Sequence, residues 1–349
     1  MSTKTPLWQI TAHDVMKQHR ATGEPVSQLV STLSRSRKLG SRDRKLVGEA
    51  VYAWIRELPW PSWFLKKLEK EYGDKAPALI KALRERAQPV LAIDRRHCDI
   101  DQVQAVLLQE KIETRKPALI EGALVVESAE FSWEVIPKEL QKSLWLMDEA
   151  SQIAASSVDA KPGELVLDMC AGGGGKTRYL LQTGAQIIAM DISEKRIRAS
   201  LEREGLERAT HVVADGLNPP FREGTFDWII IDAPCSGTGT LRRAPDLLSR
   251  LAEQDLCNYV TTQQALIKSA ASLLKPAGKL IYVTCSVLPE ENRQIVSWIK
   301  NELSTLKPLS LSDIWGHQVK TELCPQANSI QLLPSIHGCD GFFVAAYLN

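Results

Sequence analysis

The stretch 164–177, ELVLDMCAGGGGKT, decides the fold of this 349-residue chain. Its first half is an apolar run that ends at Asp168, and its second half is a glycine run that leads into helix-forming residues. A buried strand followed by a glycine-rich turn and a helix is typical of α/β proteins that bind a nucleotide-like ligand at the strand end. This segment therefore predicts a parallel sheet with a ligand site at the glycine run.

Four further apolar runs follow at intervals that leave room for helices, namely 185–191, 211–215, 226–234 and 278–285. Near-continuous apolar strands separated by helical stretches indicate a parallel sheet covered on both faces. The last segment, 337–349 (HGCDGFFVAAYLN), predicts a turn and a closing strand. We expect an α/β fold over residues 145–349.

The chain upstream of this sheet has a different pattern. Helical periodicity predicts amphipathic helices over 42–56, 64–72 and 76–86. A small α+β unit follows, with strands at 89–94 and 123–128 around a helix at 99–112. We therefore expect three parts: a basic helical region at 1–86, a small α+β unit at 87–144, and the large α/β region at 145–349.

The composition is that of a globular protein, with 44% hydrophobic and 24% charged residues. No apolar run reaches the ~18–20 residues that span a bilayer, and the N-terminus lacks the apolar core of a secretory signal. We expect a soluble cytoplasmic protein with no membrane partner. The seven cysteines are odd in number and form no C-x-x-C pair, which predicts reduced thiols and no metal site.

The net charge of +1 conceals a basic cluster near the N-terminus. The segment 34–45, SRSRKLGSRDRK, holds Arg35, Arg37, Lys38, Arg42, Arg44 and Lys45. Such a cluster suits contacts with RNA phosphates. The alternative is a solvated helix face, and the two interpretations remain open.

Three interpretations compete for the glycine run. A phosphate-binding P-loop fails because Cys170 stands where its first glycine is required. A dinucleotide fingerprint fails because Thr177 or Arg178 stands at its last glycine. A nucleoside cofactor fits better, since Asp191 and Asp215 end the next two strands, where they could bind ribose hydroxyls and an adenine amino group. S-adenosylmethionine meets these demands best, although each aspartate could instead be a helix N-cap.

Two cysteines end the last two parallel strands, Cys235 in DAPCSGTGTLRR (232–243) and Cys285 in YVTCS (282–286). Neighbouring strands lie about 4.8 Å apart, so both thiols face one pocket if these strands are adjacent. A thiolate is needed where the target atom is not nucleophilic, as at carbon 5 of a pyrimidine, because attack at carbon 6 activates it. Strand-end cysteines can also be small buried hydrophobes, our interpretation for Cys98, Cys257 and Cys324.

Together these motifs resemble the Sun family of RNA (cytosine-C5) methyltransferases, which includes bacterial 16S rRNA enzymes. The similarity is densest from residue 147 to the end, through DISEKRI, VVADG, the two cysteine motifs, LPEEN and LLPSIHGCDGFF, and extends weakly upstream to about residue 60. It implies a class I, Rossmann-like, S-adenosylmethionine-dependent methyltransferase. It also implies a small RNA-binding unit and part of a NusB-like helical module.

The resemblance assigns roles that spacing alone leaves open. Cys285 would be the nucleophile, Cys235 would assist breakdown of the covalent adduct, Asp232 would bind the cytosine at N3, and Lys176 would lie near the junction of cofactor and base. Arg242 and Arg243 are candidates for RNA phosphate contacts. The expected cofactor-binding residues are Cys170, Ala171, Gly172, Gly173, Gly174, Gly175, Lys176, Asp191, Arg196, Asp215 and Asp232.

One departure from the family concerns the cofactor loop, which usually reads C-A-A-P-G-G-K-T but has Gly172 and Gly173 here. The loss of proline removes a fixed φ and predicts weaker cofactor affinity. The expected function is formation of 5-methylcytosine in RNA, with rRNA favoured over tRNA and no obligate protein partner. The rivals are a non-catalytic RNA-binding or ribosome-assembly factor and, weakened by the failed fingerprint, a nicotinamide-dependent oxidoreductase.

Overall fold

The computed structural model describes residues 5–128, 131–203, 205–315, 319, 323 and 327–349; Cys324 lies outside this part of the chain. Two compact units divide the chain. The first consists of Met1–Arg86 and Thr240–Asp255, and the second of Ala87–Gly239 and Leu256–Asn349.

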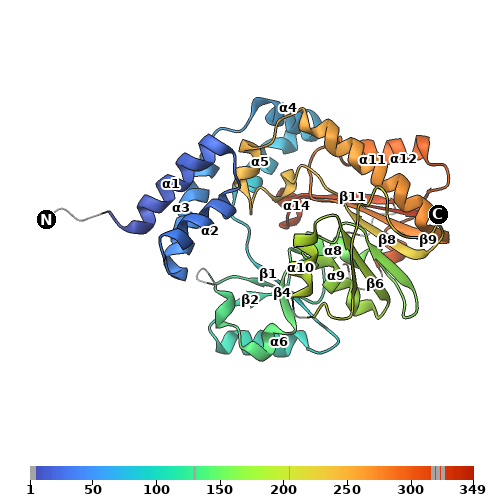
Figure 1. The fold of residues 1–349 in the computed structure, drawn as a ribbon, viewed down its shortest axis with the longest axis horizontal. Helices are drawn as coiled ribbons and strands as arrows, with labels where there is room; N and C mark the ends of the chain where they lie inside the picture. The colour runs from blue at the N-terminus through green and yellow to red at the C-terminus, as the bar shows by residue number, and fades with distance from the viewer. Residues whose placement is uncertain (1–4, 129–130, 204, 316–318, 320–322, 324–326) are drawn as a thin grey trace. The chain divides into compact units, whose positions relative to one another are not determined.

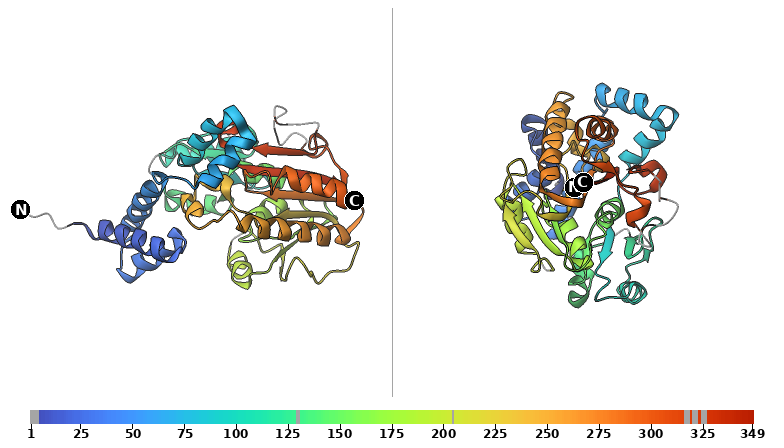
Figure 2. Two further views of the ribbon diagram at one scale, coloured as in Figure 1. Left: turned by 90° about the horizontal axis from the view of Figure 1, so that it is seen from above. Right: turned by 90° about the vertical axis from the view of Figure 1, so that its right-hand side faces the viewer.

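The first unit is helical (blue in Figures 1 and 2). Its helices are α1 (Leu7–Thr22), α2 (Val26–Ser36), α3 (Ser41–Arg56), α4 (Ser62–Tyr72), the short 3-10 turn η1 (Gly73–Lys75) and α5 (Ala76–Arg84). The first three pack around one apolar core, which α3 enters through Val47, Val51 and Ile55. Trp54 of α3 is 39% exposed, and its ring contacts that of His13 with the ring centroids 4.9 Å apart.

The segment Thr240–Asp255 is remote in sequence but belongs to this helical unit. It contains the 3-10 helix η5 (Pro245–Ser249). The buried carboxylate of Asp246 accepts the backbone N–H of Val26 at 3.2 Å. His19 Nε2 lies 2.7 Å from Ser249 Oγ. Residues 240–255, which lie far downstream of Arg86 in the sequence, therefore complete the packing of the helical unit.

A small antiparallel sheet begins the second unit. Its strand order is β2-β3-β1-β4, and its strands are β1 (Val90–Ile93), β2 (Thr114–Arg115), β3 (Ala123–Val126) and β4 (Leu144–Leu146). Leu91, Ile93 and Leu124 pack with helix α6 (Ile100–Gln109). Val90 and Ala92, on the other face, join a core shared with the large sheet. The small sheet and the large sheet are thus parts of one packed body. Two short helices, η2 (Trp133–Val135) and α7 (Lys138–Gln141), precede β4.

The large sheet has the order β10-β12-β9-β8-β5-β6-β7, with β11 paired to β12. Five neighbouring strands of this sheet, from β9 to the edge strand β7, are parallel, as predicted. They are β5 (Leu165–Asp168), β6 (Gln186–Asp191), β7 (Thr210–Val213), β8 (Phe226–Asp232) and β9 (Leu274–Thr284). The closing strand β12 (Phe342–Leu348) runs antiparallel beside β9, in red in Figure 2. The remaining strands are β10 (Lys307–Pro308) and β11 (Ser329–Leu332).

Helices cover both faces of this sheet (Figure 1). Alternate strand residues divide between two cores: Val166 and Ile230 face α8 and α9, whereas Leu167 and Ile229 face α11 and α12. The helices are α8 (Glu149–Ser156), α9 (Gly175–Leu180), η3 (Leu181–Thr183), α10 (Glu194–Leu201), η4 (Thr238–Thr240), α11 (Asp255–Leu273), α12 (Arg293–Glu302), α13 (Ser312–Trp315) and α14 (Pro334–His337). The Rossmann-like fold expected from the sequence is confirmed. In such sheets ligands bind where the strand order reverses, here between β5 and β8. None of the described helices has the length and apolarity to cross a bilayer.

Candidate active site

The two strand-end cysteines lie side by side. Strand β8 pairs in parallel with β9, with Asp232 opposite Val283, so the loops that follow both strands leave the sheet at the same edge. Cys235 Sγ and Cys285 Sγ are 3.4 Å apart, and both residues are partly buried. The sequence predicted a shared position for the two thiols only if their strands were adjacent, and β8 and β9 are adjacent.

A buried carboxylate joins the two cysteine loops. Glu291 is 0% exposed and follows the second loop in the segment LPEEN. Its Oε1 accepts the backbone N–H of Ser236 at 2.8 Å and Gln263 Nε2 at 3.1 Å. Its Oε2 accepts the hydroxyls of Ser236 at 2.5 Å and Ser286 at 2.6 Å. Each serine directly follows one of the two cysteines, so a single side chain fixes both loops.

Lys176 and Asp232 form a second charged pair beside the thiols. Lys176 lies in the first turn of α9 and is 7% exposed. Its Nζ donates to Asp232 Oδ2 at 2.7 Å and lies 5.3 Å from the centroid of the Phe342 ring. Burial opposes the charge of Lys176, but the Asp232 carboxylate outweighs it and raises the lysine pKa. The pair therefore places a positively charged ammonium group and a hydrogen-bond acceptor, the Asp232 carboxylate, in a largely buried site.

The two thiols have different electrostatic surroundings. The hydrogen bond to Cys285, burial and the negative charge of Glu291 together raise the pKa of Cys235. Cys285 instead interacts with the ammonium group of Lys176. A negative neighbour favours the protonated form of a thiol, so the surroundings of Cys235 hold it as the thiol.

The glycine run forms a tight turn between β5 and α9. Gly172 and Gly174 have φ values of +55° and +80°, which disfavour any other residue. A Cβ at Gly174 would also lie 2.5 Å from side-chain atoms of Leu206 and Ser200. Arg203 donates to the carbonyl of Gly173 at 2.8 Å and covers its outer side. Ala171 bonds through its N–H to the carbonyl of Met190 on β6, and Cys170, partly buried, precedes it.

Acidic residues follow the next two strands, and the first of them, Asp191, contacts this turn. Asp191 is 3% exposed, and its Oδ2 accepts the N–H of Gly172 at 2.9 Å. Arg196 lies 3.7 Å from the same oxygen. Asp215 accepts the N–H of Leu217 through Oδ1.

Two exposed hydrophobic side chains complete this region. Ile192, directly after Asp191, is 66% exposed, and Leu217, two residues after Asp215, is 42% exposed. Apolar surfaces next to carboxylates suit a flat adenine ring joined to a ribose. Backbone turn, carboxylates and apolar walls together fit an adenosine-type cofactor.

Asp168 has a structural position. It is 0% exposed and accepts the hydroxyl of Thr177 at 2.7 Å. Burial raises its pKa to about 7. It ties β5 to α9 under the glycine turn and is no helix N-cap.

The basic residues expected to contact RNA are in the helical unit, which includes Arg242 and Arg243. Arg37 is paired with Asp14 and donates to Thr11 Oγ1 at 3.0 Å, so its side chain supports the packing of α1 and α2. Arg242 is partly buried, and its carbonyl accepts Arg56. The exposed members are Arg35, Lys38, Arg42, Arg44, Lys45 and Arg243. Their contact with RNA stays a prediction.

Reasoning from the sequence missed several side chains of this site. Glu291 lies in a motif that was noticed, but nothing in a single sequence marks it as buried. Phe342 begins the closing strand and was expected only as part of that strand. Ile192 offered a usable signal, because an apolar residue directly after a strand-end aspartate is out of place in a solvated turn.

Comparisons with known proteins give consistent results. A family model described as 16S rRNA methyltransferase RsmB/F matches residues 155–348. A second, described as an RsmF/B-like ferredoxin-like domain, matches residues 60–131.

Among curated relatives, ribosomal RNA small subunit methyltransferase B of Vibrio cholerae is 32% identical over 294 residues, which cover 82% of this chain. The matched part is 64% of that relative, so the chain spans just under two thirds of its length. A solved methyltransferase homologue from Pyrococcus horikoshii is 25% identical, with a TM-score of 0.67, and the match covers 85% of this chain and 97% of that one. The structure of NSun6 from the same organism, with SFG, has a TM-score of 0.70 at 18% identity, over 82% and 98% of the two chains; this likeness concerns the fold.

Proposed function

The chain belongs to the 16S rRNA methyltransferase RsmB/F family, and from this premise we propose that it forms 5-methylcytosine in RNA, with ribosomal RNA as the substrate, from S-adenosylmethionine. The observation that carries the proposal is the 3.4 Å separation of two thiols with opposite electrostatic neighbours. A protein that merely binds RNA has no use for this arrangement.

S-adenosylmethionine would supply an electrophilic methyl group. Asp191 and Asp215 would hold its ribose and adenine, with the backbone of 170–175 close to it and Ile192 against the ring. Asp191 already accepts backbone N–H groups, and each of its oxygens retains a second lone pair for a ribose hydroxyl.

Cys285 would begin the reaction as the nucleophile, beside Lys176. Its sulfur bonds to carbon 6 of the cytosine, the C5=C6 electron pair moves into the ring, and N3 takes up a proton. The Lys176–Asp232 pair, joined by a hydrogen bond of 2.7 Å, would deliver that proton and later take it back. Carbon 5, now nucleophilic, takes the methyl group as N3 returns its proton.

Cys235 would then assist release. It stays protonated because of its hydrogen bond to Cys285, its burial and Glu291. As the bond between sulfur and carbon 6 breaks, Cys235 gives its proton to the departing sulfur of Cys285. The proton that leaves carbon 5 restores Cys235, and the C5=C6 bond reforms. The proton of Cys285 goes to solvent before the next cycle, which balances the reaction.

The test uses variants Cys235→Ala and Cys285→Ala, 16S rRNA transcribed in vitro without modification, and S-adenosylmethionine labelled in its methyl group. We expect Cys235→Ala to accumulate a nuclease-sensitive RNA–protein adduct on a denaturing gel, and the double variant to form none. Cys257→Ala, which alters an exposed cysteine on α11, should behave like the wild type.

Two outcomes would change this assignment. If the wild type transfers no methyl group and Cys235→Ala forms no adduct, the chain is better explained as a ribosome-assembly factor. If the wild type methylates cytosine but the adduct accumulates in Cys285→Ala instead, the roles of the two thiols are reversed.

A further inference from the structure

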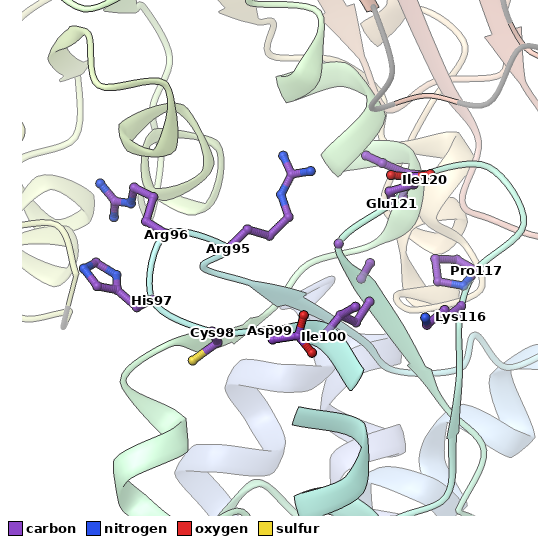
Figure 3. Close-up of a pocket in the computed structure, with 12 residues that line it drawn as sticks. Arg95, Arg96, His97, Cys98, Asp99, Ile100, Lys116, Pro117, Ile120 and Glu121 are labelled. Carbon is purple, nitrogen blue, oxygen red and sulfur yellow. The ribbon is translucent and has the colours of Figure 1, made fainter. Parts of the chain in front are cut away.

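The proposed reaction makes no use of two features of the second unit. One is a cavity of about 710 Å³ between the turn 95–100 after β1 and the segment 116–123 (Figure 3). The other is a network of side-chain amides beside the loop that carries Cys285. The walls of the cavity come from the small sheet, whereas the network contacts both sequence neighbours of Cys285. The network therefore bears directly on the nucleophile.

Asn292 binds the residues on either side of Cys285. It is 2% exposed and directly follows Glu291. Its Oδ1 accepts the hydroxyl of Thr284 at 2.6 Å, and its Nδ2 donates to the carbonyl of Ser286 at 2.9 Å. Glu291 binds the hydroxyl of Ser286 instead, so the two contacts are distinct. One amide group therefore holds the chain on both sides of the nucleophile.

Gln331 holds that amide group in turn. It lies in the closing hairpin, which consists of β11, the connection 333–341 and β12. Its Oε1 accepts Asn292 Nδ2 at 2.7 Å. Its Nε2 donates to the carbonyls of Ser286 at 3.2 Å and Phe342 at 3.0 Å. With its oxygen facing an NH2 group and its nitrogen facing carbonyls, the side chain is satisfied at both ends, and it connects the hairpin to the loop of Cys285.

The closing hairpin also contacts the loop of Cys235. The N–H of Gly239, in that loop, donates to the carbonyl of Cys285, and the N–H of Gly341 donates to the carbonyl of Gly239, both at 2.9 Å. A Cβ at Gly239 would lie 1.9 Å from the carbonyl oxygen of Gly341, so no larger residue fits at this crossing. The hairpin therefore supports both cysteine loops, one through the Gln331 side chain and the other through main-chain atoms.

Main-chain pairing holds the hairpin in the sheet. It joins β11 to β12 over Ser329–Leu332 and β12 to β9 over Phe343–Leu348. The bonds from the Gln331 side chain to Asn292 and Ser286 lead to the nucleophile loop instead. Loss of this side chain should therefore disturb the loop more than the hairpin.

We propose that Gln331 is a positioning residue for Cys285: through Asn292 and the Ser286 carbonyl it holds the sulfur at the point from which it attacks carbon 6. A nucleophile must lie about 3–3.5 Å from the atom it attacks, and misplacement by about 1 Å can cost about 100-fold in rate. The inference rests on the proposed function and deepens it, because it gives the closing hairpin a part in the attack on the base.

The test measures single-turnover methyl transfer from labelled S-adenosylmethionine to unmodified 16S rRNA. Gln331→Leu keeps the approximate size of the side chain and removes its bonds to the loop. We expect the maximal rate constant to fall about 20-fold, while the apparent affinities for RNA and for S-adenosylmethionine stay within about twofold of those of the wild type. Gln331→Glu keeps the acceptor for Asn292 but turns an oxygen toward the carbonyls, and its rate should fall at least as far. Gln186→Leu makes the same change at an exposed position in β6 and is the matched control.

Thr284→Val provides a second perturbation of the same network. Valine has nearly the shape of threonine but donates no hydrogen bond to Asn292, so we expect a maximal rate about fivefold lower. Because Gln331 and Thr284 both act through Asn292, the loss of rate in the double variant should be smaller than the product of the two single losses. A loss equal to that product would contradict the proposal.

Urea denaturation identifies any variant that fails to fold. If Gln331→Leu is one of them, Gln331→Glu takes its place in the comparison with Thr284→Val. If neither variant of Gln331 folds, the residue is required for folding and the inference is wrong.

The remaining outcomes separate the two proposals. If the wild type methylates cytosine and Gln331→Leu does so within about twofold of its rate, the inference is wrong and the proposed function stands. The inference is also wrong if Gln331→Leu loses stability and affinity for RNA and cofactor in step with its rate, since a merely structural residue acts on all of these. If the wild type does not methylate RNA, the proposed function fails and this inference falls with it.

Discussion

Replacement of Glu291 by glutamine tests the physical argument for the active site most directly. Glutamine keeps the size and one oxygen but removes the negative charge from a position that is 0% exposed. In the wild type, four donors bind the Glu291 carboxylate, two from Ser236 and one each from Gln263 and Ser286. The change therefore acts on both cysteine loops at once.

The expected loss of stability follows from these four bonds. The two bonds to the remaining oxygen change from charge-assisted to neutral, and the two donors that face the new NH2 group lose their acceptor, at a cost of about 0.5–1 kcal/mol each. The sum, about 2–4 kcal/mol, is partly offset because a buried charge no longer has to be desolvated. We expect Glu291→Gln to lower the free energy of unfolding by about 2 kcal/mol, as measured by urea denaturation.

The same substitution should change the reactivity of one thiol. Without the Glu291 charge, the pKa of Cys235 falls toward its ordinary value, and more thiolate is present at pH 8. Alkylation by iodoacetamide, followed by mass spectrometry of the peptides, should show Cys235 reacting at least about threefold faster relative to exposed Cys257. Glu302→Gln, which removes an exposed charge at the end of α12, is the control and should change neither quantity. Unchanged Cys235 alkylation together with unchanged stability would refute the assignment of Glu291 as the residue that holds both loops and keeps Cys235 protonated.

Three further predictions concern the cofactor turn and the charged pair. Gly174→Ala introduces a Cβ at a φ of +80° and should cost about 2 kcal/mol of stability and weaken S-adenosylmethionine binding in calorimetry. Gly48→Ala in α3, where a Cβ would meet nothing within 4 Å, is the control and should bind the cofactor normally. Lys176→Met leaves Asp232 without its cation and should slow single-turnover methyl transfer by roughly 100-fold or more; a fall of less than tenfold would contradict its place in the reaction. Asp168, whose pKa burial raises to about 7, favours folding in its protonated form, so its contribution is complete below about pH 4 and is lost as the pH rises through 7. Relative to Asp168→Asn, the wild type should thus lose up to about 4 kcal/mol of its free energy of unfolding between pH 4 and 8, as measured by urea denaturation. If the difference in free energy of unfolding between the two proteins does not change with pH, Asp168 does not titrate in this range.

The sequence predicts most of the fold because its strands are strongly apolar and end in recognisable residues. The five parallel strands and the closing strand were each expected within a few residues of their observed positions. Strand order was not available from the sequence, because the order of strands along the chain does not specify which of them are hydrogen-bonded neighbours. The distance between Cys235 and Cys285 depends on that order. The sequence alone could therefore predict that the two thiols are close only if β8 and β9 are neighbours, as the structure has them.

The side chains that position the cysteines were harder to predict for a different reason. A glutamate in LPEEN has the same appearance as a solvated residue before a helix, and burial of Glu291 becomes favourable when four donors from three separate segments converge on it. Arg37 illustrates the opposite case. In the sequence it belongs to a basic cluster, but α1 places Asp14 next to it, and this contact arises from packing between helices.

The membership of Thr240–Asp255 in the helical unit has a consequence for biosynthesis. During translation, α1 to α5 leave the ribosome well before Asp246 and Ser249, the partners of Val26 and His19. At 5–20 residues per second, the intervening residues 87–239 take roughly 8 to 30 seconds to synthesise. Throughout this interval the nascent helices lack part of their packing surface. We therefore expect a nascent chain stalled after α5 to be more sensitive to protease in this region than one stalled after α11, so that this N-terminal module completes its folding late, together with the loop that follows Cys235.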